Sequence, residues 1–173
     1  MTASLVVRVA PGDVAGLEAR ARDLSNPAGS GTAERWALVR FTLGGAPYAV
    51  ELALLECVVT RLGTAGPLAG APAGIRGLAF VDSVPHVAVD LVHRTSGVER
   101  ELAALSQAPA LVLRSEESAS AVCVEGPLEL VDAPRPASPS LAEGPVAGRL
   151  ADGTLVLSSQ WLLSWVASLG EGR

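Results

Sequence analysis

The sequence predicts an all-β, barrel-like domain that carries only a few short helices. Apolar and polar residues alternate with a period of two through most of residues 36–157, as expected for strands with one buried face. Clusters of Gly, Pro, Asp and Ser interrupt the apolar runs at short intervals, as turns do in β-sandwiches and barrels. Counted in this way, the chain holds about eight to ten short strands.

The overall composition limits the kinds of partner. A chain of 173 residues can bury a core as one ordinary domain or as two small interlocked ones. Its net charge of −5 argues against nucleic-acid binding, which needs a basic stripe. Cys57 and Cys123 lack CxxC spacing, so we expect two reduced core thiols. Because no run reaches the roughly 18 apolar residues of a membrane span, we expect a cytoplasmic protein without membrane insertion.

The first 35 residues are predicted to form an N-terminal extension and linker, and the main domain then spans residues 36–173. Residues 4–10 have a strand pattern. Residues 25–35 concentrate Ser, Gly and Pro and have the composition of a flexible linker. Between them, Asp13 is a candidate cap for a helix with one apolar face formed by Val14, Leu17, Ala21 and Leu24.

The first half of the main domain is predicted to consist of strands. Residues 36–52 form a hairpin with one buried face, in which a Gly-Gly-Ala-Pro turn separates two alternating runs. A third strand is expected at 54–59. The run at 78–91 is a further strand region with an edge or bend at Pro85, because proline cannot donate to a sheet.

The second half adds strands, two helices and a loop. Residues 110–126 are predicted as two apolar strands around a polar tip, and 146–157 as a hairpin turning at Asp-Gly. Residues 132–145 are rich in proline and are expected to form a loop. A short helix is expected at 98–105. A C-terminal helix capped by Ser158 or Ser159 would carry an apolar stripe of Leu162, Trp165, Val166 and Leu169.

No motif for catalysis is found in the sequence. His86 and His93 are the only histidines, stand outside any metal or nucleophile motif, and are predicted as surface or edge residues. The Gly-rich stretch 61–74 lacks the GxGxxG pattern of a phosphate cradle. The sequence therefore predicts a non-enzyme with no catalytic residue, no cofactor and no metal site. The carboxylates of the strand regions are scattered rather than paired: Glu56, Asp82, Asp90 and Glu125.

Several motifs, taken in order, resemble those of CheW-like domains, which occur in chemotaxis coupling proteins and in CheA-type histidine kinases. The opening ALVRFTLGGAPYAVEL and the following LLECVV resemble the first strands of the family. PAGIRGLAFVDS (72–83) resembles its P-x-x-[IV]-x-G-[VL] block, and VPHVAVDL ends on the expected Asp90-Leu91. SAVCVEGPLELV and VAGRLADGTLVLSSQWLL are similar to the closing motifs. This resemblance, over roughly residues 36–166, implies two packed five-stranded SH3-like β-barrels with short helices.

The resemblance also implies a function without chemistry. It is that of an adaptor in two-component signal transduction, which couples a methyl-accepting chemoreceptor tip to the regulatory domain of a CheA-type histidine kinase in a bacterial chemosensory array. Exposed apolar side chains on the kinase side are expected at Val81, Val84 and Val87. The receptor or partner contacts that the resemblance implies are Leu54, Leu55, Glu56, Phe80, Asp82 and Ser83. For the first three, the ordinary alternative is two core leucines and a solvated glutamate.

Asp82 and Ser83 stand where the family usually has Arg-Gly, and Phe80 stands where it has Asn. One interpretation is a changed contact, in which an acid repels the usual acidic partner group and favours another partner. The other is a turn that ends one strand, because Asp and Ser are common turn residues. The two interpretations are compatible. A rival alignment places Arg76-Gly77 on the motif but requires a six-residue insertion before Asp90.

Two other function classes stay open beside the adaptor. A β-barrel that binds a small ligand would show one large apolar pocket with a few convergent polar groups. An adaptor would instead show packed barrels and an exposed apolar patch. An enzyme would need a cluster of His or carboxylate side chains that the sequence does not show.

Overall fold

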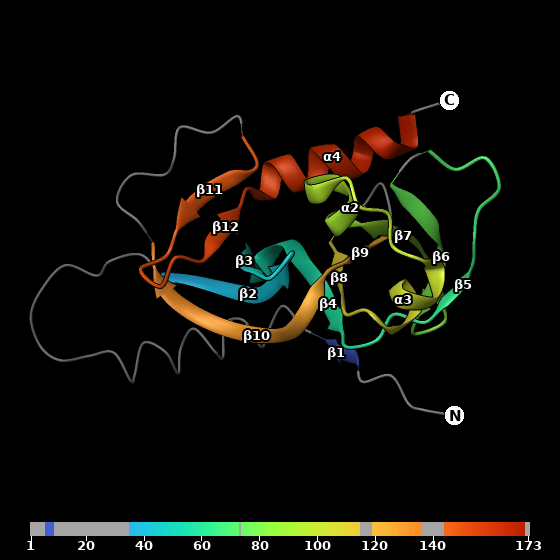
Figure 1. Cartoon of the computed structure of the whole chain (residues 1–173). Helices are drawn as coiled ribbons and strands as arrows, with labels where there is room; N and C mark the ends of the chain where they lie inside the picture. Colours follow the sequence, from blue (N-terminus) through green and yellow to red (C-terminus); the bar gives the residue numbers. More distant parts are fainter. Residues whose placement is uncertain (1–5, 9–34, 73, 115–118, 136–143, 172–173) are drawn as a thin grey trace, which may run out of the picture.

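The computed structural model describes residues 6–8, 35–72, 74–114, 119–135 and 144–171 (Figure 1). The strands are β1 (Val6–Arg8), β2 (Arg35–Leu43), β3 (Ala46–Glu51), β4 (Leu55–Val59), β5 (Thr64–Gly66), β6 (Ile75–Val81), β7 (Val84–Asp90), β8 (Ala110–Leu113), β9 (Ser120–Cys123), β10 (Glu125–Pro134), β11 (Val146–Arg149) and β12 (Leu155–Leu157). The helices are η1 (Leu52–Leu54, a 3-10 turn), α2 (Leu91–Ser96), α3 (Leu102–Gln107) and α4 (Ser159–Glu171).

The strands form two sheets, which confirms the predicted all-β class with two strand-built units. One sheet has five strands in the order β10-β2-β3-β12-β11. The other has the order β1-β4-β8-β9-β7-β6-β5, in which the three-residue strands β1 and β5 flank a run of five. β1 comes from the predicted N-terminal extension and pairs antiparallel with β4, placing Val6 opposite Val59 and Arg8 opposite Cys57.

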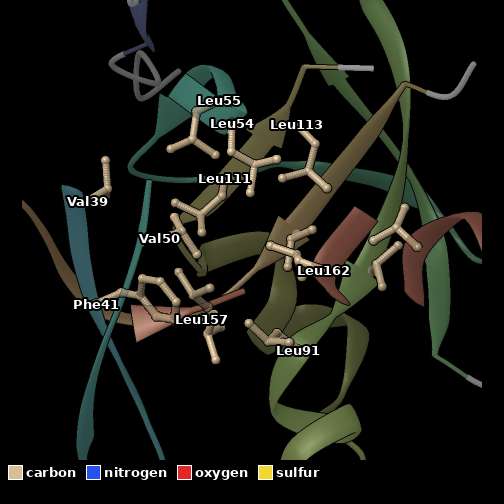
Figure 2. Packing of buried hydrophobic residues seen from close by; sticks show 14 of the residues in the cluster. Val39, Phe41, Val50, Leu54, Leu55, Leu91, Leu111, Leu113, Leu157 and Leu162 are labelled. Atoms are coloured by element: carbon tan, nitrogen blue, oxygen red, sulfur yellow. The ribbon is translucent and has the colours of Figure 1, made fainter. Parts of the chain in front are cut away.

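Three clusters of buried side chains fill the molecule, one shared by both sheets and one for each sheet. The shared cluster gathers residues of β2, β3, β8, β12 and α4, among them Phe41, Leu111 and Leu162 (Figure 2). In β8, Ala110 and Val112 belong to the private cluster of the seven-stranded sheet, whereas Leu111 and Leu113 belong to the shared one. Strands of the seven-stranded sheet are therefore buried on both faces.

The seven-stranded sheet curls on itself, as a barrel requires. Cys57 and Val59 of β4 pack in one cluster with Ala79 and Val81 of β6. In the sheet order, however, three strands lie between β4 and β6. Strands so far apart can share a core only when the sheet bends round between them, which agrees with the predicted barrel-like architecture.

The predicted first hairpin is confirmed as β2 and β3. Its two turn residues, Gly44 and Gly45, have φ of 57° and 80°, as a type I′ turn needs at both central positions. The burial differs from the prediction of a single buried face. Val39 and Phe41 enter the shared core, but Leu38 is buried on the opposite face in the cluster of the five-stranded sheet.

The predicted C-terminal helix is confirmed as α4, which runs from the end of β12 past α2 (Figure 1). Ser158 caps it, because the Trp161 amide donates to Ser158 Oγ at 3.3 Å and the Leu162 amide donates to the Ser158 carbonyl at 3.0 Å. The predicted stripe packs on the shared core and comprises Leu162, Trp165, Val166 and, half-buried, Leu169.

A buried ion pair joins Asp90, the last residue of β7, to Arg100, which lies between α2 and α3. Asp90 is fully buried, and both its carboxylate oxygens lie 3.1 Å from Nε of Arg100. The same carboxylate accepts a hydrogen bond from the Val92 amide at 3.0 Å and so caps α2. Gly97, with φ of 72°, ends that helix.

Both helices after β7 differ from the sequence prediction. The segment expected to be a helix at 98–105 becomes helical only at Leu102, because Arg100 must reach back to Asp90 and its carbonyl accepts a hydrogen bond from Arg76 at 2.7 Å. The short helix α2 was not predicted, since its six residues directly follow an apolar strand.

Gly77 allows β5 to approach β6 closely. A Cβ at this position would lie 2.2 Å from the carbonyl oxygen of Gly66, which no side chain can accommodate, and φ at Gly77 is 153°. The glycine of the 72–83 motif therefore has a packing role in the second sheet.

Several predictions concern residues outside the described ranges: the helix after Asp13, most of the linker 25–35, the polar tip at 115–118 and much of the loop at 132–145. The hairpin at 146–157 is confirmed by β11 and β12. The loop prediction is wrong at its start, because β10 continues to Pro134. Among the helices of the described part of the chain, none has the length and apolar character to cross a membrane.

Candidate functional site

The β6–β7 hairpin ends in a two-residue turn at Asp82 and Ser83, where the motif comparison had placed a changed contact. Their φ angles are 48° and 68°, and they are the only residues other than glycine with positive φ in the described ranges. Such angles satisfy a type I′ turn but cost free energy for side chains with a Cβ. The turn interpretation is therefore correct, and the strand break predicted at Pro85 lies at these two residues.

Pro85 sits inside β7 because its missing amide is not needed there. It pairs with Phe80, one step from the Val81–Val84 pair that closes the turn, so its nitrogen faces away from β6. On that other side, β9 pairs with β7 only from Val87 onward. A proline is tolerated at such a position.

The end of this hairpin exposes apolar side chains. Phe80 is 54% exposed and Val84 is 50% exposed, and Pro85 opposite Phe80 is exposed as well. Because paired residues point to the same side of a sheet, Phe80 and Pro85 form one face and Val84 lies on the other. The exposed apolar side chains at this hairpin end are therefore divided between its two faces.

A hollow of about 110 Å³ lies beneath the turn, between the hairpin and strands β4 and β8. We call it the hairpin hollow. It brings together four of the nine predicted contact residues, two of them acids and two of them valines. Its lining consists of Glu56, Cys57, Val81, Asp82, Val84, His86, Val112, Leu113 and Ala119.

His86 is the residue of this site that the sequence did not reveal. It is only 5% exposed, which corrects the prediction of a surface or edge histidine. Its Nδ1 lies 2.9 Å from the carbonyl oxygen of Val84. His86 pairs across the hairpin with Ala79, so both side chains turn toward the interior of the curled sheet. A period-two count from Val84 would have placed positions 84, 86 and 88 on one face. It would not have shown which face is buried.

The predicted contact residues divide between surface and core. Glu56 is exposed on β4. Leu54 and Leu55 are 7% and 0% exposed and pack in the shared core, so they offer a partner no contact surface. Val81 is also buried, and Val87 is half-buried against the shared core. The burial of Leu54 and Leu55 agrees with the alternative of two core leucines, and the burial of Val81 corrects the expectation of an exposed side chain there.

The chemistry available at the described residues is limited. No group of three or more His, Cys, Asp or Glu side chains within them is arranged to hold a metal ion. Cys123 is buried, and this burial, assisted by the nearby Asp90 carboxylate, raises the pKa of its thiol to about 12. A second hollow of about 250 Å³ lies at the end of the five-stranded sheet, beside β10 and the β11–β12 turn. Small-molecule pockets usually measure about 300–1,000 Å³.

No protein-family model matches the sequence, and no curated protein does. The structure is nevertheless similar to the crystal structure of the scaffolding protein TtCheW from Thermoanaerobacter tengcongensis. The TM-score is 0.54 at 15% sequence identity, and the match covers 72% of this chain and 90% of that chain. This chain has a CheW-like fold. The architecture that the ordered motifs implied is thereby confirmed.

The turn residue Ser83 carries backbone strain. It adopts φ of 68°, which glycine adopts without strain. The turn thus holds a residue whose Cβ resists its backbone conformation. Strained turns that persist in this way often mark functional surfaces.

Proposed function

We propose that this protein is a non-catalytic adaptor that couples chemoreceptors to a CheA-type histidine kinase in a bacterial chemosensory array. The observation that carries the proposal is the CheW-like fold, shared with a scaffolding protein over 72% of this chain. The exposed apolar end of the β6–β7 hairpin supports it, because an adaptor needs a surface that partners can cover. The proposed partners are the regulatory domain of the kinase and the cytoplasmic tip of a methyl-accepting receptor.

Within this proposal, the partner-facing surface is the end of the β6–β7 hairpin together with the adjoining part of β4. Phe80, Asp82 and Ser83 face the receptor or another partner, and Glu56 adjoins them. Val84, with the half-buried Val87 further along the strand, contributes to the kinase side. Leu54, Leu55 and Val81 act through packing, because they hold β4 and the hairpin in place from within the core.

The test is binding of the purified full chain to the kinase regulatory domain and to the receptor tip encoded near its gene. We expect both partners to co-elute with the wild-type chain. Phe80→Asp or Val84→Asp should weaken binding to one partner at least tenfold, since a buried charge replaces an apolar contact. Leu130→Asp, at a 64% exposed apolar position on β10, is the matched control and should bind normally. If the wild-type chain binds neither partner, the adaptor function is rejected.

Charge at position 82 gives a second, more specific test. If the usual partner presents an acid here, Asp82 repels it. Asp82→Arg should then strengthen binding to a standard receptor tip, and an unchanged pull-down would reject that explanation. A small-ligand-binding module is less well supported, because the two hollows described above are smaller than ordinary ligand pockets.

A further inference from the structure

We infer that the N-terminal strand β1 is a removable cover on the outer edge of β4 that limits access of the receptor tip, an inference that rests on the proposed adaptor function. β1 (Val6–Arg8) pairs antiparallel with residues 57–59 of β4, and β8 pairs with the other edge of β4. Without β1, β4 would therefore be an edge strand of its sheet. Exposed edge strands pair readily with other chains, so proteins usually cover them.

A bulge at Glu56 separates the covered part of β4 from the part that the proposed function assigns to a partner. Leu55 and Cys57 pair with adjacent residues of β8, so Glu56 is the extra residue between them. The stretch that pairs with β1 ends at Cys57, opposite Arg8. Glu56 itself is exposed, and both Glu56 and Cys57 line the hairpin hollow. A partner that contacts Glu56 would therefore meet the end of β1 within one residue.

Only a short backbone pairing holds β1 on β4. β1 has three residues, whereas β10, an edge strand of the five-stranded sheet, has ten. In water, the net gain from one backbone hydrogen bond is similar to the cost of ordering the backbone of one residue. The paired and released states of a three-residue strand are therefore close in free energy, and a partner can shift the balance between them.

The covalent link allows β1 to leave β4 and to return. Residues 9–34 join β1 to β2. A stretch of this length could span up to roughly 90 Å when fully extended, so the link does not force β1 onto β4. A linked segment rebinds at an effective concentration that can reach about the millimolar range. A partner must compete with β1, and its apparent affinity is reduced in proportion to the fraction of molecules whose β4 edge is uncovered.

The first experiment removes the β1–β4 pairing within the full chain. The test variant is Val6→Pro with Val7→Pro, because the amides of consecutive strand residues point to opposite sides and one of the two lost donors must face β4. The matched control is Gly29→Pro with Ser30→Pro in the predicted linker. Amide hydrogen exchange is measured by NMR at residues 57–59 of β4, with residues 111–112 of the central strand β8 as the internal reference.

We expect at least one amide of residues 57–59 to exchange at least about threefold faster in the test variant than in the wild-type chain, and the control to match the wild type. In the wild-type chain this amide should still exchange at least about tenfold faster than the amides at 111–112, because β1 leaves without unfolding of the core. An unchanged rate in the test variant would show that β1 does not cover β4. Wild-type exchange as slow as at 111–112 would show that β1 does not leave. Either result overturns the inference.

The second experiment separates this inference from the adaptor function by titrating the receptor tip against the wild-type chain and both variants. Exchange and binding depend on the same uncovered fraction, so the gain in affinity of the test variant should equal its gain in exchange rate within about twofold. Equal affinity of the test variant and the wild-type chain, or the same gain in the control, overturns the inference and leaves the adaptor function standing. If none of the three chains binds the receptor tip or the kinase regulatory domain, the adaptor function is rejected, and the role assigned to β1 is rejected with it.

Discussion

Asp90 offers a stringent test of what holds the connection between β7 and α3 in place. Its carboxylate is fully buried, lies 3.1 Å from Nε of Arg100 through both oxygens, and caps α2 through the Val92 amide. Asp90→Asn keeps an oxygen for the cap but removes the charge, so Arg100 is left without a counterion at a site where its side chain is only 15% exposed. Breaking a buried pair from one side costs about 3–5 kcal/mol. The residual exposure of Arg100 favours the lower end of that range.

The measurement is urea unfolding followed by tryptophan fluorescence, with thermal unfolding as a second assay. For a chain of this size each kcal/mol shifts Tm by about 2–4 °C, so we expect Asp90→Asn to lower Tm by at least about 6 °C. The matched control is Asp132→Asn, which removes the solvent-exposed pair with Arg35 at 2.9 Å. Exposed pairs contribute about 0–1 kcal/mol. Equal losses in the two variants would refute the reasoning.

A double variant sharpens the same prediction. Arg100→Met combined with Asp90→Asn removes the uncompensated cation, so part of the lost stability should return. The loss of stability in the double variant should therefore be smaller than the sum of the losses in Asp90→Asn and Arg100→Met alone. Additive losses would show that Asp90 and Arg100 do not act as a pair.

Three further predictions concern other positions. Gly77→Ala should destabilise the chain by more than about 2 kcal/mol, because its Cβ would overlap a backbone carbonyl. Gly144→Ala, where a Cβ meets nothing within 4 Å, should change stability by less than about 0.5 kcal/mol in the same urea assay. Ser83→Gly should raise stability by about 0.5–1 kcal/mol by removing left-handed strain, and a loss would contradict the strained turn. Cys123, with its pKa raised to about 12, should resist iodoacetamide at pH 8 in the native chain and react after unfolding, as judged by peptide mass spectrometry. Native labelling as fast as in urea would show that the thiol is not buried.

The parts of the fold that the sequence predicted are those in which local pattern and global packing agree. The β2–β3 hairpin combines alternation with two glycines that both adopt positive φ. The C-terminal helix combines a serine cap with a stripe that the core accepts. In both cases a short stretch of chain contains the full physical reason for its structure.

Burial could not be assigned where both faces of a strand are apolar. In β8, Leu111 and Leu113 enter the shared core while Ala110 and Val112 enter the other cluster, and the sequence is apolar throughout. The same ambiguity left Leu54 and Leu55 open between a core role and a contact role, since the shared core exists only when the two sheets pack. Long-range packing, rather than local pattern, decides such positions.

The prediction of a helix at 98–105 was wrong at its start for a related reason. Its sequence favours a helix from the start, but the buried Asp90 carboxylate recruits Arg100 from a segment ten residues away and holds that segment extended. An unpaired buried carboxylate would cost more free energy than the first turn of a short helix contributes. Tertiary electrostatics thus overrides helix propensity at this point.

The hairpin hollow shows why a motif comparison and a structure answer different questions about the same residue. In the motif, Asp82 is a single change of charge, and a turn or a changed contact explains it equally well. In the fold, Asp82 lines one hollow together with Glu56, which comes from a strand 26 residues earlier, and with His86. The turn interpretation and the contact interpretation therefore concern one structure, because the left-handed backbone at Asp82 places this residue at the hollow.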